Sequence, residues 1–478
     1  MKYHSIVLLL FIGLQCQAQT LLEMINIAQS KSLDAIYVKH KYKTAELAYK
    51  YYKADRLPEI KLTAIPFMYN SDVVERYSYE DDRTVYRAQQ SLYSTTNLTI
   101  KQNVDFLGGY FYVESDLRHY KTIQNTTNQY TAVPFRFGYN QSLLGYNPFK
   151  WNKKIENLNF TLSKKETSSE NEQIAIETIT RFFQVVTLSE QLKLAKMKYA
   201  TCDSLYKVGI YKKSLGRISS NDLYELKIEM IKSDTEIQEI QTKIDIEKKS
   251  FADYLQLEDT TNFNFIVPTE IPNIDIPLNK AQELAIENSS VLLKYGKSNL
   301  QNKQAEKQLK TQSFLDANIK VNVGWHQVSD NFKSMYNHLL NEQSILVNVT
   351  IPLVDFGRKK AQLSQIRENM ELDRINEQKA KNAIIDEIQA KVAYIPVYQR
   401  KIESALETYH LAEMMFKEVL ESFVLGRSTF SKVSDAIVHQ KSALVDYYMT
   451  IRDYWLNYYE IRSLTLYDFE KGQSVLNN

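Results

Sequence analysis

The chain has 478 residues and a formal net charge of +2, from 59 basic and 57 acidic side chains. Because the basic residues are dispersed rather than clustered, we expect no nucleic-acid partner. The sequence contains 33 tyrosines but only 12 glycines and 9 prolines. Because glycine and proline interrupt helices and strands, their scarcity predicts long regular elements.

The N-terminus predicts export. An apolar run from residue 6 to residue 14 follows a basic start, and Cys16 and Ala18 are small residues of the kind that signal peptidase prefers. We therefore expect residues 1–18 to be a secretory signal peptide. A lipidated Cys16 is the alternative, although Gln15 stands where a small residue is normally found.

The mature chain then retains Cys202 as its sole cysteine, so no intrachain disulfide can form and stability must come from packing. No stretch after residue 20 contains the roughly 20 consecutive apolar residues of a membrane helix. If the mature chain enters a membrane, it must do so as a closed β-barrel, the other structure that satisfies every backbone group in lipid.

The sequence contains two copies of one unit. Residues 22–53 resemble residues 279–310 at an offset of 257, and the segment beginning at Leu215 resembles the one beginning at Leu425 at an offset of 210. The first copy therefore carries about 47 extra residues, which we place as a hairpin or loop within 70–132.

Each copy reads in the same order: helix, strand, strand and two long helices. We expect a first repeat at 19–261, a linker at 262–277, a second repeat at 278–470 and a C-terminal tail at 471–478. The linker contains Pro268, Pro272 and Pro277 and cannot be helical.

Strands are indicated where apolar and polar residues alternate, as Ile319, Val321 and Val323 do with Lys320 and Asn322. Strands of this kind suit a water-filled transmembrane barrel, and a soluble half-buried sheet has the same alternation. The export signal and the tyrosines near the strands favour the barrel. The other segments with this pattern are 60–64, 98–106, 135–139 and 345–353.

The helices carry apolar residues at spacings of three and four, which is typical of coiled-coil packing. The helix expected from Gly357 to Phe423 would be about 100 Å long if straight, with a bend near Pro396. Four clear strands per chain are too few to close a barrel, because bacterial barrels have at least about eight strands. The barrel interpretation therefore requires oligomerisation.

This order of parts resembles the TolC-like outer-membrane efflux family over nearly the whole mature chain. The resemblance rests on the duplicated unit, on glycine turns at the helix tips and on the strand-to-helix junction at 351–361. That junction contains Pro352, Asp355 and Gly357, and the first copy has a looser version around Pro148. The C-terminal segment 462–469 resembles members of the Bacteroidetes type.

The resemblance implies a mainly α fold with transmembrane β structure. Long coiled-coil helices would form an α-barrel, and four strands per chain would contribute to a trimeric, twelve-stranded outer-membrane β-barrel. It also implies that the protein is the exit duct of a tripartite efflux or type I secretion system. The partners would be two further copies of the chain, a periplasmic adaptor (membrane fusion) protein, an inner-membrane pump and outer-membrane lipid.

The same resemblance places functional residues at the periplasmic tips. Adaptor docking would involve Gly216, Arg217, Gly426, Arg427 and Ser428, the last standing where the family has an arginine. At the second tip the family has two aspartates that narrow the pore, and here Lys432 occupies the first of these positions.

Asp435 occupies the second position, and Asp222 in the first copy offers a further carboxylate, so we expect these two residues at the pore constriction. Simpler roles stay open for the same residues: the glycines as helix C-caps and the aspartates as carboxylates at helix N-termini.

No catalytic, cofactor-binding or metal-binding pattern was found, so we expect a passive conduit and not an enzyme. The main alternative is a periplasmic coiled-coil protein with a structural or adhesive role. Transport of proteins or polysaccharides instead of small molecules also stays open.

Overall fold

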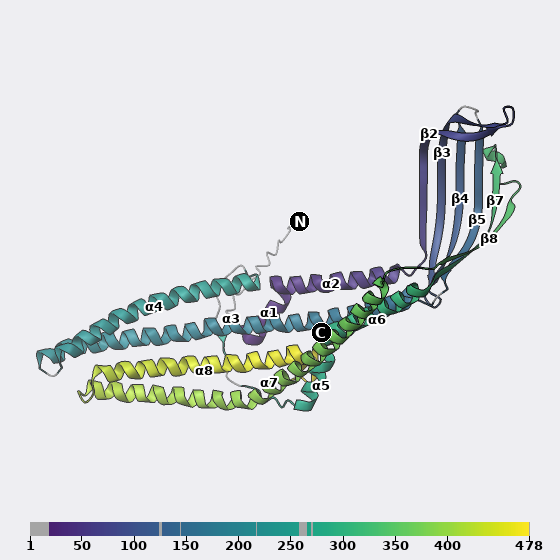
Figure 1. Ribbon diagram of the computed structural model, residues 1–478. Coiled ribbons are helices and arrows are strands. Elements are labelled where there is room, and N and C mark those ends of the chain that lie inside the picture. The colour runs from purple at the N-terminus through teal and green to yellow at the C-terminus, as the bar shows by residue number, and fades with distance from the viewer. Residues whose placement is uncertain are drawn as a thin grey trace, which may run out of the picture. The chain divides into compact units, whose positions relative to one another are not determined.

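The computed structural model describes residues 19–123, 127–143, 145–216, 218–257, 265–268 and 271–477. The predicted signal peptide, residues 1–18, lies outside the described residues. Two compact units are present, and each takes segments from both halves of the sequence. The first unit is helical, and the second contains the large sheet (Figure 1). Their segments are 1–43, 163–290 and 379–478 for the first, and 44–162 and 291–378 for the second.

The expected long helices are confirmed. Helices α3 and α7 have 67 residues each, and α4 and α8 have 36 each. Helix α7 continues through Pro396. Within the described part of the chain, no helix combines the length and the apolar character needed to cross a membrane. The helices are α1 (Leu21–Lys31), α2 (Leu33–Ala54), α3 (Pro148–Ser214), α4 (Ser220–Leu255), α5 (Leu278–Asn288), α6 (Ser290–Phe314), α7 (Arg358–Val424) and α8 (Phe430–Thr465).

The duplication is visible in the elements themselves. Helices α1 and α5 have 11 residues each and begin 257 residues apart, at Leu21 and Leu278. Helices α3 and α7, of equal length, begin 210 residues apart, at Pro148 and Arg358. The two offsets found in the sequence therefore recur at the starts of equivalent helices.

The core of the helical unit lies where α1, α2, α3, α4, α5, α7 and α8 meet. Phe182 and Phe251 are fully or almost fully buried there, as are Ile388, Tyr454 and Tyr458. Burying side chains of this size contributes about 1.5 to 3 kcal/mol each, so this cluster is the main source of stability for the unit. A second cluster lies toward the helix tips and includes Cys202, whose thiol has its pKa raised to about 11 by burial.

A buried ion cluster joins the end of α8 to the middle of α3. The guanidinium of Arg462 lies 3.0 Å from Glu172 and 3.2 Å from Asp468, and the two carboxylate side chains are only 2% and 4% exposed. The hydroxyl of Tyr458 donates to Asp468 at 2.8 Å. This cluster holds the C-terminal segment, where β9 (Tyr467–Asp468) pairs with β10 (Gln473–Ser474), against the core.

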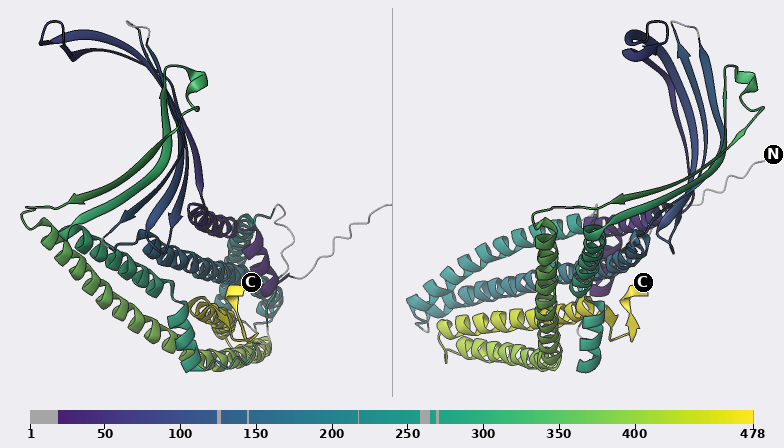
Figure 2. Two further views of the ribbon diagram at one scale, coloured as in Figure 1. Left: turned by 90° about the vertical axis from the view of Figure 1, so that its right-hand side faces the viewer. Right: turned by 45° about the vertical axis from the view of Figure 1, so that its right-hand side comes forward.

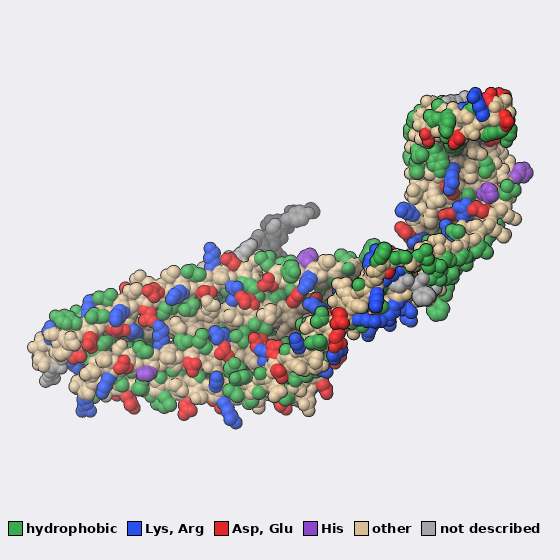
Figure 3. Space-filling view, in the orientation of Figure 1, with side chains coloured by type: hydrophobic (Ala, Val, Ile, Leu, Met, Phe, Trp, Pro, Cys, Tyr) green, Lys and Arg blue, Asp and Glu red, His purple; other side chains and the backbone are tan. Residues whose placement is uncertain are grey.

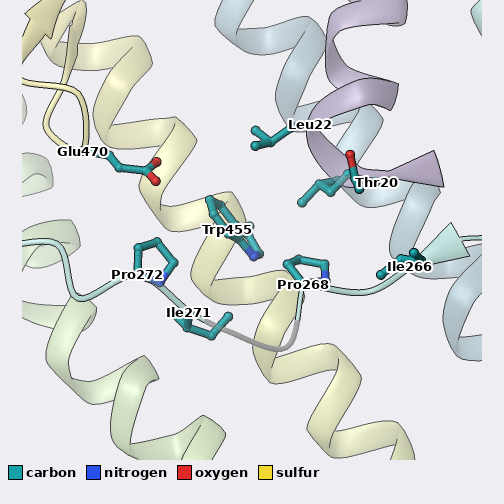
Figure 4. A pocket seen from close by; sticks show the side chains of 9 residues that line it. Thr20, Leu22, Ile266, Pro268, Ile271, Pro272, Trp455 and Glu470 are labelled. Carbon is teal, nitrogen blue, oxygen red and sulfur yellow. The ribbon is translucent and has the colours of Figure 1, made fainter. Parts of the chain in front are cut away.

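The described part of the expected linker contains no helix, as its prolines predicted. Strand β6 (Phe265–Ile266) pairs in parallel with β1 (Gln19–Thr20), and the Tyr454 hydroxyl donates to the carbonyl of Pro272 at 2.7 Å. The linker, the start of α1 and α8 line an open pocket of about 480 Å³, in which the Trp455 ring faces Pro268 and Pro272 (Figure 4). The linker therefore packs onto the helical core.

The second unit contains one curved antiparallel sheet, seen from two sides in Figure 2. Its strand order is β2-β3-β4-β5-β7-β8, so β5 of the first repeat pairs directly with β7 of the second. The strands are β2 (Glu59–Ser78), β3 (Arg83–Val104), β4 (Gly109–Thr122), β5 (Asn128–Ser142), β7 (Asp316–Ser329) and β8 (Leu340–Thr350).

The expectation of four strands per chain is wrong, because the sheet has six. The extra residues of the first repeat form two long strands instead of a loop, and Gly108, with φ +82°, makes the turn between them. Strand β4 was missed because its aromatic residues, such as Tyr110 and Phe111, occupy both faces and blur the alternation. Two predicted strands also ran too far, since β3 ends before Phe106 and β8 before Pro352, which has no N–H to donate.

Candidate functional site

The six-stranded sheet has two chemically different faces. Residues directly opposite each other on neighbouring strands share a face, and successive residues alternate between faces. One row runs through Ile60, Ile100, Val113, Phe137 and Val323. Except for Val113, which is half-buried, these side chains are 36% to 68% exposed, so an apolar face without a covering layer extends across five strands.

The opposite face is polar and carries an ion-paired row. Arg136 on β5 lies 2.5 Å from Glu114 on β4 and 2.8 Å from Glu342 on β8, and it crosses β7 to reach the latter. The crossing is possible because Gly324 lies between them: a Cβ there would come within 3.1 Å of the Arg136 Cβ. The three side chains therefore lie along the sheet, and the guanidinium offsets part of the negative charge of the two carboxylates.

A second long side chain also passes over a glycine of the neighbouring strand. Tyr112 on β4 passes over Gly138 on β5, and its hydroxyl donates to the Asn322 side chain on β7. A Cβ on Gly138 would lie 2.0 Å from the Tyr112 ring. The register thus places Tyr112 on the polar face of the sheet. Arg136 was read only as part of an alternating strand.

The two strand-to-helix junctions are capped by side chains. Pro148 is the first residue of α3, and the Asn147 side chain accepts a hydrogen bond from the Lys150 N–H at 3.2 Å. In the second repeat, the chain leaves β8, passes Pro352 and turns into α7 at Gly357, which has φ +82°.

Asp355 caps the start of α7. Its carboxylate accepts from the N–H of Gly357 at 3.0 Å and from that of Lys359 at 3.2 Å. These two backbone hydrogen bonds hold the pKa of Asp355 below its usual value. The junction residues therefore act by ending one element and beginning the next.

The predicted tip glycines end the two longest helices. Gly216 has φ +68° and Gly426 has φ +75°, the left-handed conformation that favours glycine. At the second tip, the Gly426 N–H donates to Phe423 at 3.0 Å and the Arg427 N–H donates to Ser422 at 2.8 Å, which is a Schellman cap. Arg217 lies outside the described residues, and Arg427 is exposed.

The two tips are in contact. The Lys212 ammonium donates to the carbonyl of Val424, and both tips line a cavity of about 140 Å³. Asp222, Gly426 and Ser428 are among the residues that line it. The structure thus brings three of the predicted tip residues together.

The two predicted constriction residues differ in their surroundings. Asp222 is half-buried and pairs with the N-cap of α4, because its N–H donates to the Ser219 hydroxyl at 3.0 Å and its carboxylate accepts from that hydroxyl at 2.8 Å. Asp435 is exposed on α8. Thr429, the equivalent N-cap of the second tip, makes no side-chain cap hydrogen bond.

Replacing Gly426 with alanine is expected to lower the melting temperature, because a Cβ in the left-handed conformation costs about 1 kcal/mol. Gly296, inside helix α6 and with open space around its Cα, is the matched control. Alanine there should raise the melting temperature, since alanine favours a helix interior by about 1 kcal/mol over glycine. Circular dichroism at 222 nm measures both, and equal shifts would contradict the role of the cap.

No family model matches the sequence, and no curated protein matches it. Solved structures do resemble it. A membrane protein from Pseudomonas aeruginosa matches with a TM-score of 0.68 at 12% identity, covering 95% of this chain and 92% of that one. The outer membrane protein VceC from Vibrio cholerae matches with a TM-score of 0.64 at 14% identity, covering 93% and 96%.

The CmeC outer membrane channel from Campylobacter jejuni matches with a TM-score of 0.66 at 12% identity, covering 94% of this chain and 88% of that one. The likeness confirms the coarser part of the expected fold class, a mainly helical chain with one large sheet. The trimeric barrel and the assignment to a Bacteroidetes-type member stay predictions. The chain has the fold of bacterial outer-membrane channel proteins.

Proposed function

We propose that the protein is an outer-membrane channel, the exit duct of a tripartite efflux or type I secretion system. The observation that carries this proposal is the two-faced sheet, with exposed aliphatic and aromatic side chains on one side and the Glu114, Arg136 and Glu342 row on the other. A wall between lipid and a water-filled pore needs these two faces. The helices differ from the sheet in this respect, because charged side chains are dispersed over their visible surface (Figure 3).

The proposal requires more than one copy of the chain. Strands β2 and β8 are the edges of the sheet, and each leaves one row of backbone groups without a partner among the described strands. Open edges are not tolerated in lipid. We propose that three copies pair these edges and close a barrel, as the family resemblance implies.

The tips that end α3 and α7 would receive the periplasmic adaptor and, through it, the inner-membrane pump. Gly216, Gly426, Arg427 and Ser428 are all on or beside the turns that end these helices. Asp222 and Asp435 would narrow the entrance. The channel itself would be a passive conduit and not an enzyme, and the pump would supply the energy.

The proposal is tested by purifying the mature chain in detergent and measuring its mass by light scattering after size exclusion. We expect a detergent-bound particle of three chains that forms conducting pores in planar lipid bilayers. A monomer that stays soluble without detergent would overturn the proposal and favour a periplasmic coiled-coil protein.

A further inference from the structure

Strands β3 and β4 have no counterpart in the second repeat. Strand β2 begins at Glu59 and β7 begins 257 residues later, at Asp316, so these two strands are equivalent. Strand β5 leads into α3 as β8 leads into α7, so these two are also equivalent. The first repeat therefore contains an inserted hairpin, β3–β4, between its two repeat strands.

The inserted hairpin is a full part of the sheet. Strand β3 pairs with β2 from Glu59 to Ser78, with one irregularity, and β4 pairs with β5 along most of its length. Side chains of β4 also reach the second repeat: Tyr112 donates to Asn322 on β7, and Glu114 shares Arg136 with Glu342 on β8. The hairpin thus contributes two wall strands instead of a loop on the rim.

The inserted strands continue both faces of the wall. On the apolar face, Leu98 and Ile100 of β3 and Phe111 of β4 are exposed, in line with Phe137 of β5. On the polar face, Glu114 and its neighbours continue the ion-paired row. A hairpin outside the membrane would have water on both sides, which would not favour apolar side chains on one face only.

The edges of this sheet are compatible with closure. Neighbouring strands are all antiparallel, so β2 and β8, the first and last of six, run in opposite directions. Strand β8 of one chain can therefore pair antiparallel with β2 of the next. Pro66 on β2, which cannot donate, lies at the irregularity between Ile65 and Met68, and a bulge is a position where sheets tolerate proline.

We propose that the exit pore is an eighteen-stranded barrel, six strands from each of three chains, and not a twelve-stranded one. This rests on the channel function proposed above. Because barrel diameter grows roughly linearly with strand number, at equal tilt the bore would be about 1.5-fold wider. Such a barrel would admit larger hydrated solutes at its mouth than a twelve-stranded barrel, although the entrance at the helix tips would still limit what passes through the whole channel. Glycines 138 and 324 serve the same end, since they let Tyr112 and Arg136 lie along the wall and not across the pore.

The direct test is to image the wild-type trimer in lipid nanodiscs by electron cryomicroscopy and count the strands in the barrel wall. Eighteen strands are expected, and twelve would overturn the inference. A particle that is not a trimer, or that forms no pore, would instead overturn the proposed function, so the two failures are distinguishable.

A second measurement compares pore bores in planar bilayers. Neutral polyethylene glycols of increasing size are added only on the side of the barrel mouth, so that they enter the barrel before they reach the narrower entrance at the helix tips. The smallest one that no longer lowers single-channel conductance marks the cutoff of the barrel. The matched variant replaces residues 71–127 with an Asn-Gly turn, joining β2 to β5 and leaving four strands per chain. We expect the cutoff radius to fall by about one third in the variant. An unchanged cutoff in a conducting variant would contradict the inference.

Discussion

Replacing Arg462 with leucine is expected to destabilise the helical unit by about 3 to 5 kcal/mol, the largest effect that we predict for a single residue. The substitution would leave Glu172 and Asp468 without their shared cation, while their side chains are only 2% and 4% exposed. An unpaired charge buried in this way costs far more than the ion pair itself contributes. The measurement is the melting temperature of the purified protein at pH 7.5.

The same variant should show a specific pH dependence. Burial raises the pKa of Glu172, and the Arg462 guanidinium opposes that shift. Without the cation, the pKa of Glu172 should rise further. A carboxyl group whose pKa is raised by folding stabilises the fold at low pH and loses that contribution as the pH rises through the folded pKa. The difference in melting temperature between variant and wild type should therefore narrow from pH 7.5 to pH 5.

Arg452 provides a control on the same helix. It pairs at 2.8 Å with its neighbour Asp453, and both side chains are more than a quarter exposed. Its replacement by leucine should cost less than about 1 kcal/mol, as expected for a surface ion pair. If both arginine variants lost similar stability, or if the effect at Arg462 did not depend on pH, the buried cluster would not have the role described.

Replacing Val323 with lysine is expected to prevent stable insertion of the protein into membranes. Val323 lies on the apolar face, between Phe137 on β5 and Gln343 on β8. A lysine facing lipid costs about 2 to 4 kcal/mol near the middle of the bilayer, and three chains would bear this cost together. The measurement is the fraction of the chain that stays in membranes after a urea wash.

The matched control is Asn318, on the same strand but on the polar face, opposite Asn348. Lysine at this position should leave membrane insertion and trimer formation unchanged, because its ammonium would face water. If Val323→Lys inserted as well as Asn318→Lys, the apolar face would not contact lipid. That result would favour a soluble sheet.

Much of the local structure was predictable because it depends on neighbours in the chain. The alternation of Val321 and Val323 with Lys320 and Asn322 determines which side chains share a face, whatever the strand pairs with. Gly426 ends α7 because few other residues adopt its φ of +75°. Equal spacing of repeated segments likewise predicted that α3 and α7 would be equivalent helices.

Contacts between distant segments were not predictable in this way. Arg136 and Glu342 are 206 residues apart, and Arg462 and Glu172 are 290 apart. Each of these residues belongs to an alternating strand or a coiled-coil helix that contains many charged residues, and the sequence pattern does not distinguish the buried ones from the others. Only the packing of the elements decides which of them become buried and paired.

The sequence by itself determined the duplicated unit, the long helices and the existence of amphipathic strands, because each follows from local periodicity and backbone conformation. The tertiary structure alone decided that β3 and β4 join the sheet, that β5 pairs with β7, and that Asp222 lies beside Gly426 and Ser428 at the tips. The physical reason is that hydrogen bonding between strands and packing between helices depend on which distant segments meet, and an alternating pattern is compatible with several partners.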